Sequence, residues 1–86
     1  MPNVSMFYGI KINFYHGDHA PPHFHAEYAG NSAMVNILTN TVIKSSLPKR
    51  QLKLVLAWAE LNKDELMHNW ELCQAGLEPL PIKPLR

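Results

Sequence analysis

Two runs of alternating apolar and polar residues, separated by a pair of prolines, constrain the fold of this chain more than any other feature. The first run covers about residues 6–15 and the second about residues 23–29. Side chains of a strand point alternately to opposite faces, so a period of two indicates a strand with one buried face. Pro21 and Pro22 stiffen the segment between the runs into an extended form. The pattern therefore predicts two strands joined by a stiff loop.

Two further strands are expected from the residues that follow. Gly30-Asn31 stands between strand-like runs and is typical of a two-residue hairpin turn, which predicts a third strand over about residues 33–38. Thr39-Asn40 has the composition of another turn and leads to a short fourth strand over about residues 41–44. These four strands follow one another closely, so an antiparallel meander is the simplest sheet they can form.

The register of this sheet follows from matching the faces of neighbouring strands. Apolar residues should meet apolar residues, and opposite charges should lie side by side. The expected pairs are Tyr28 with Ala33, Ala26 with Val35 and Phe24 with Ile37 across the hairpin, and Lys11 with Glu27 and Asn13 with His25 across the proline loop.

Two helices are predicted in the second half of the chain. The first covers about residues 48–61 and opens on Pro48, a residue favoured at the first helical position. The second covers about residues 63–75, with Asn62 as its N-cap. The proline-rich tail, 77–86, cannot continue as a helix. We expect an α+β fold in which an antiparallel meander sheet of three or four strands carries two helices on one face.

Length and composition limit the classes of protein to consider. Eighty-six residues make a single domain, 1–86. The net charge of +1 gives no overall attraction to nucleic acid, and the single Cys73 suits a reducing cytoplasm. No apolar run is long enough to span a membrane, so we expect a cytoplasmic protein without a membrane partner. The sequence is compatible with a homo-oligomer.

The strongest chemical signal is a segment that holds four of the five histidines, residues 16–27. Side chains at positions i and i+2 of a strand share a face, so His23 and His25 can converge on one ion. His19 could reach the same point from the loop, and Glu27 or Asp18 could complete the set. Three such ligands are typical of catalytic zinc or of non-haem iron, so the cofactor considered is a divalent metal such as zinc.

Two alternatives need no metal. His23 and His25, with His19 as a substitute, could act as acid and base on RNA, with Lys11 or Lys49 steadying the phosphate. The histidines could instead be structural, in a module that binds protein or nucleic acid without catalysis. Cations in the first turn oppose the helix dipole, and such a group favours phosphate or an acidic partner surface. This basic cluster consists of Lys49, Arg50 and Lys53.

Residues along nearly the whole chain resemble a family of small bacterial proteins, domain of unknown function 4160. They are Tyr8-Gly9-Ile10, His19-Ala20-Pro21-Pro22-His23-Phe24-His25-Ala26, Leu47-Pro48, Trp58-Ala59, Leu66, Asn69-Trp70 and Ile82-Lys83-Pro84-Leu85. The resemblance implies a site at His19, Pro21, Pro22, His23 and His25 but no activity. It also implies a small protein partner encoded nearby, as in toxin–antitoxin pairs, and an RNA or DNA target. It leaves open whether the protein is an enzyme.

Overall fold

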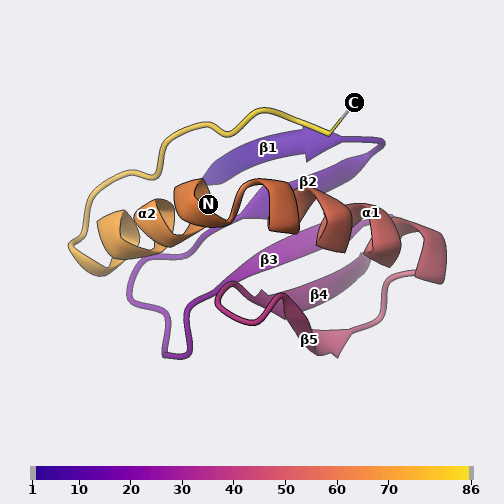
Figure 1. Cartoon of the computed structure of the whole chain (residues 1–86), viewed down its shortest axis with the longest axis horizontal. Coiled ribbons are helices and arrows are strands. Elements are labelled where there is room, and N and C mark those ends of the chain that lie inside the picture. The colour runs from indigo at the N-terminus through magenta and orange to yellow at the C-terminus, as the bar shows by residue number, and fades with distance from the viewer. Residues whose placement is uncertain (1, 86) are drawn as a thin grey trace.

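The chain folds into one five-stranded antiparallel sheet and two helices, as the computed structural model of residues 2–85 shows (Figure 1). Neighbouring strands in the sequence are neighbours in the sheet. The elements are β1 (Asn3–Phe7), β2 (Ile10–Asn13), β3 (His23–Tyr28), β4 (Asn31–Asn36), β5 (Thr41–Ser45), α1 (Lys49–Leu61) and α2 (Lys63–Gln74). The α+β class and the antiparallel meander are confirmed, but the expected three or four strands are five.

The additional strand arises because the segment predicted as one strand, 6–15, is a hairpin. Tyr8 and Gly9 form its turn with φ angles of 49° and 77°. Two consecutive positive φ values are typical of a type I′ turn, whose twist matches that of the flanking strands. The apolar alternation continues through this turn, so it hides the reversal of the chain. Tyr8, expected on the apolar face, is 59% exposed at the tip.

The β3–β4 hairpin turns one residue earlier than predicted, at Ala29-Gly30, where both φ angles are positive. As a result Ala26 pairs with Ala33 and not with Val35. The shift is two residues in register, so the apolar residues stay on the predicted face. The pairs predicted across the proline loop, Lys11 with Glu27 and Asn13 with His25, are confirmed.

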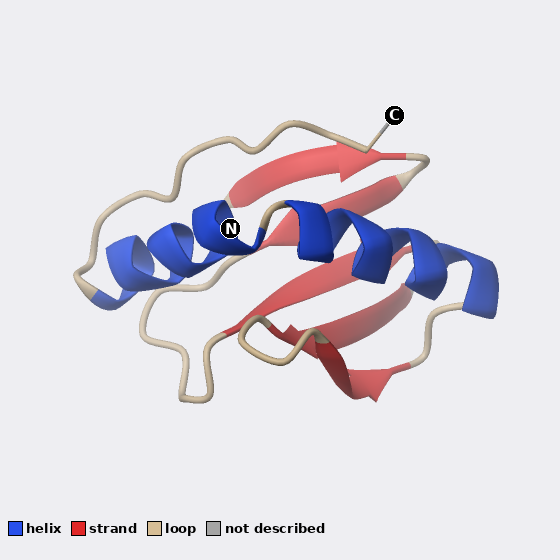
Figure 2. Ribbon diagram, in the orientation of Figure 1, coloured by secondary structure: helices blue, strands red, loops and turns tan. Residues whose placement is uncertain are grey.

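Both helices cover the apolar face of the sheet (Figure 2). Pro48 precedes α1 as its N-cap and is not its first helical residue. Asn62 is the N-cap of α2, as predicted, but its side chain makes no capping bond and donates instead to the carbonyl oxygen of Trp58. The largest fully buried side chains include Ile10, Ile12, Phe14, Phe24 and Val35 from the sheet side and Val55, Trp58 and Leu66 from the helices.

The segment after α2 is extended, as predicted, and runs beside β1 (Figure 1). The backbone N–H of Ile82 donates to the carbonyl oxygen of Val4 at 2.8 Å. The buried side chain of Asn69 exchanges two hydrogen bonds with the backbone of Leu80. These contacts attach the tail to the sheet edge and to α2; Arg86 lies outside the described residues. Within residues 2–85, no helix is long and apolar enough to cross a membrane.

Candidate metal centre

The loop between β2 and β3 is fixed by contacts with distant parts of the chain. The side-chain amide of Gln74, at the end of α2, donates to the carbonyl oxygen of Asp18 at 2.9 Å. His16 Nε2 lies 3.0 Å from the carbonyl oxygen of Leu77 and must donate to it. At the loop's end, Ile37 donates its backbone N–H to the Pro22 carbonyl oxygen. The loop is therefore held against α2, the tail and β4.

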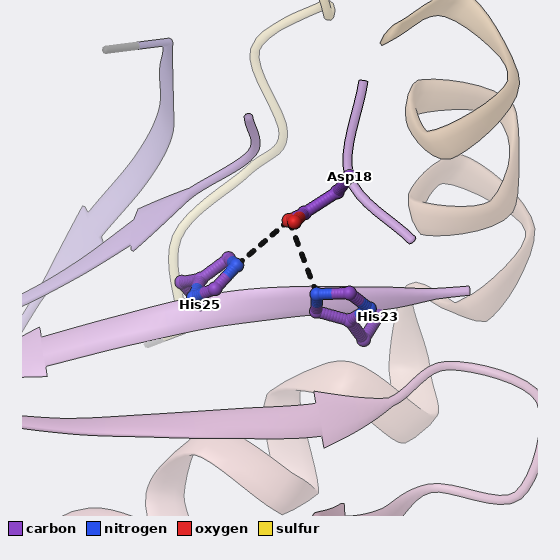
Figure 3. A group of neighbouring side chains, drawn as sticks. All are labelled: Asp18, His23 and His25. Carbon is purple, nitrogen blue, oxygen red and sulfur yellow. Dashed lines mark hydrogen bonds and ion pairs between the residues drawn. The ribbon is translucent and has the colours of Figure 1, made fainter. Parts of the chain in front are cut away.

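Asp18 turns its carboxylate from this loop toward the first residues of β3 (Figure 3). Its Oδ2 lies 3.1 Å from Nε2 of His23 and 2.9 Å from Nε2 of His25. One nitrogen or oxygen atom from each of the three side chains falls within 4.8 Å of the others. We call this group the Asp18–His23–His25 cluster. It brings two imidazoles and one carboxylate to a single point.

One ring proton of His23 is located by the contact of its Nδ1 atom. Nδ1 lies 2.8 Å from the carbonyl oxygen of Pro21, and a carbonyl oxygen only accepts, so Nδ1 carries a proton. In the neutral ring Nε2 then has a lone pair. This atom is buried and makes no hydrogen bond within residues 2–85, although Asp18 Oδ2 lies 3.1 Å away. A lone pair that faces a carboxylate oxygen needs a cation between them, either a proton or a metal ion.

The spacing of the cluster fits a metal ion. Nitrogen and oxygen ligands lie about 2.0–2.2 Å from zinc, and ligands about 90–110° apart are then about 2.8–3.6 Å from one another. The two distances from Asp18 Oδ2, 2.9 and 3.1 Å, match this separation. The Nδ1–H of His23 on a backbone carbonyl is also the contact that orients most metal-binding histidines. The donor set and its support therefore fit a divalent transition metal.

Two aromatic residues pack against the imidazoles from opposite sides. Trp70, on α2, lies 5.2 Å from the His23 ring, and Tyr15 meets the His25 ring edge-on at 4.4 Å. The His23 side chain is 4% exposed, whereas that of His25 is 20% exposed and that of Asp18 is 26% exposed. One ligand is therefore sealed in the protein, and the other two border solvent, where a small ligand can enter.

The structure brings some of the predicted site residues together and leaves others apart. His23 and His25 come together, but His19 is exposed and outside the cluster. Glu27 is also outside it and accepts a hydrogen bond from the Tyr15 hydroxyl at 3.3 Å. The group that could hold a metal ion is therefore two histidines and Asp18, the carboxylate that the sequence offered as the alternative, and it does not include His19 or Glu27.

The cations predicted to bind phosphate stand in two different parts of the fold. Lys11 is paired with Glu27 in the register of β2 and β3. The basic cluster is exposed at the start of α1, at the opposite end of the molecule's long axis from the Asp18 loop (Figure 1). The basic cluster therefore lies apart from His23 and His25, whereas phosphate binding by Lys11 or Lys49 stays a prediction.

Comparison with known families adds an independent observation. A family model described as Domain of unknown function (DUF4160) matches residues 9–71, which is more than half of the chain. The chain belongs to this family. The matched range of the DUF4160 domain contains the whole Asp18–His23–His25 cluster and Trp70. Comparisons with curated proteins and with solved structures give no match.

Tyr15 reports on the electrostatics of the DUF4160 site. Partial burial, followed by the charge and hydrogen bond of Glu27, raises the pKa of Tyr15 above its usual value of 10.0. We expect Glu27→Gln to lower this pKa, because it removes the charge that opposes the phenolate. The ¹³C signal of the Tyr15 ring, followed from pH 9 to 12, measures the change, with Tyr8 as the internal control. An unchanged Tyr15 titration would contradict the contact.

The same shift has a consequence for alkaline stability. A folded-state pKa above the unfolded value favours the protonated phenol in the folded protein. The stabilisation is therefore complete below about pH 10 and is lost as the pH rises through the raised pKa.

Proposed function

We propose that this protein is a metal-binding domain whose ion is held by Asp18, His23 and His25. The observation that carries this proposal is the buried Nε2 of His23, which makes no hydrogen bond within residues 2–85 and lies 3.1 Å from a carboxylate oxygen of Asp18. A divalent ion satisfies both lone pairs at once. A proton on Nε2 would instead give a buried ion pair between His23 and Asp18 and would leave Nε2 of His25 outside that pair.

The three ligands leave part of the coordination sphere open. Two histidines and one carboxylate with free positions are typical of non-haem iron, and three protein ligands with a water are typical of catalytic zinc. In either case a bound ion would lower the pKa of a coordinated water or polarise an oxygen of a substrate. The solvent-bordered sides of Asp18 and His25 provide the approach for such a molecule.

The resemblance adds a proposed setting for this activity, a toxin–antitoxin-like pair in the cytoplasm with a small protein partner. The basic cluster is exposed, and the ion pairs within residues 2–85 all involve histidine. The three cations of the basic cluster are thus available to an acidic partner surface or to nucleic acid. The separation of this surface from the metal site favours docking there over a role in the chemistry.

The metal proposal is tested with protein purified without nickel and stripped with a chelator. We expect one equivalent of Zn²⁺ or Co²⁺ to bind, with release of protons because the ligands bind as bases. Titration calorimetry in buffers of different ionisation enthalpy measures both quantities. His19→Ala serves as the matched control and should bind the ion as wild type does, because His19 lies in the same loop but outside the cluster.

If no metal binds, the alternative hypothesis is that the histidines act as acid and base in the cleavage of RNA. Metal-free protein incubated with labelled RNA would then cleave it, and His25→Ala would not. Intact RNA together with stoichiometric metal binding supports the metal centre. Co-purification with the product of the neighbouring gene, and its loss in a Lys49→Glu/Lys53→Glu variant, tests the partner separately.

A further inference from the structure

A hollow of about 190 Å³ lies beside the metal centre on the open face of the sheet. Its lining includes His25 of β3, Met34 of β4 and Lys44 of β5. These three residues form one row across the sheet, because His25 pairs with Met34 and Met34 pairs with Lys44. Residues paired in this way point to the same face, so His25 and Lys44 stand on either side of Met34 along the hollow.

The width of this row suits a small ligand. Neighbouring strands are about 4.8 Å apart, so the backbone of Lys44 lies about 10 Å from that of His25. A lysine stem can span much of that distance over the apolar side chain between them. The hollow is also smaller than the ~300 Å³ or more of pockets that hold drug-sized ligands. It therefore fits a single functional group or a very small molecule.

The end of the hollow at Lys44 has a donor, and the end at His25 would gain one when the proposed ion is bound. The ion pairs in the described part of the chain all involve histidine, so the Lys44 ammonium has no carboxylate partner there. Within residues 2–85 the one hydrogen bond of the His25 ring runs from Nε2 to Asp18, and Figure 3 shows the other ring nitrogen turned away from Asp18. When Nε2 binds an ion, the proton of the ring lies on Nδ1. Such an N–H normally donates to a carboxylate, a carbonyl oxygen or water.

We propose that this hollow binds a small oxyanion, a carboxylate or phosphate group of the substrate, between the Lys44 ammonium and the Nδ1–H of His25. The inference rests on the proposed metal centre, since the ion is what places the proton on Nδ1. The bound anion would hold the substrate beside the metal and would also orient the His25 ring. Lys44 is thus a substrate-binding residue distinct from the three metal ligands.

The test uses the full-length protein loaded with Zn²⁺ and titrated with two probes, sulfate as the tetrahedral oxyanion and acetate as the carboxylate. Proton–nitrogen NMR follows the Nδ1–H of His25 and the backbone of β5. We expect both signals to move, and we expect Lys44→Gln to weaken the preferred probe about threefold to fivefold at low salt, as for an exposed ion pair. Lys63→Gln, at the exposed start of α2, is the matched control.

The outcomes separate the two proposals. A protein that binds Zn²⁺ but shows no shift with either probe, or equal affinities in wild type and Lys44→Gln, overturns the oxyanion site alone. A protein that binds no Zn²⁺ overturns the metal centre and this inference with it. A stronger response to sulfate assigns a phosphate group, and a stronger response to acetate assigns a carboxylate.

Discussion

His23→Ala is expected to weaken the binding of Zn²⁺ or Co²⁺ by at least about 100-fold, since changing a mere supporting residue of a metal site already costs about 10- to 100-fold. The reason is that His23 is the ligand held most rigidly, with Nδ1 fixed on the carbonyl oxygen of Pro21 and its ring packed on Trp70. Competition with a chromophoric chelator measures the dissociation constant. An affinity within about fivefold of wild type would contradict the assignment.

Because His23 is buried, its removal also disturbs packing, and further variants separate the two effects. Asp18→Asn keeps the shape of the side chain, which is 26% exposed, and removes its charge. His25→Ala changes a ring that borders solvent. Both should weaken metal binding strongly while the circular dichroism spectrum and the unfolding midpoint without metal stay close to wild type. Full metal binding by both variants would remove the basis of the proposed function.

Trp58→Ala is expected to lower the free energy of unfolding by about 3–5 kcal/mol, the usual cost of deleting a buried aromatic side chain. Trp58 is 1% exposed and lies 5.2 Å from the Phe7 ring and 5.9 Å from the Phe24 ring. Its indole N–H also donates to the carbonyl oxygen of Lys83 at 2.8 Å, which attaches the tail. For a small domain this loss is a large share of the total stability, so much of the variant should be unfolded at 37 °C.

Urea denaturation followed by circular dichroism measures this change. Leu61→Ala, on the same helix, is the control, because Leu61 is 76% exposed and its loss should change the free energy by less than about 0.5 kcal/mol. A loss below about 1.5 kcal/mol for Trp58→Ala would mean that the core is not centred on this residue.

The sequence predicted the fold where local pattern and burial agree. The pairs of Lys11 with Glu27 and Asn13 with His25 followed from matching charge and polarity. The hairpin at Tyr8-Gly9 was missed because its flanking residues keep the same alternation on both sides of the turn. The turn after β3 was predicted one residue too late. The actual type I′ turn places Ala29 at a positive φ, and the composition of the segment does not indicate this.

Only the part of the candidate site that lies on a single strand could be predicted from the sequence. His23 and His25 share a face because they are two residues apart on β3, and the spacing alone shows this. The choice of Asp18 over Glu27 depends on the path of the loop. That path is determined by contacts with Gln74 and Leu77, more than 50 residues away in the sequence, so no local pattern contains it.

The tail along β1 also restricts how copies of this protein can associate. A sheet edge exposes unpaired backbone groups, and these can add a strand from another molecule. At Val4 the β1 edge is already occupied by the chain's own Ile82, whereas β5, the opposite edge, is exposed along its length. Edge pairing is therefore expected through β5 and not at Val4 of β1, so concentrated protein should form pairs in preference to open-ended fibres.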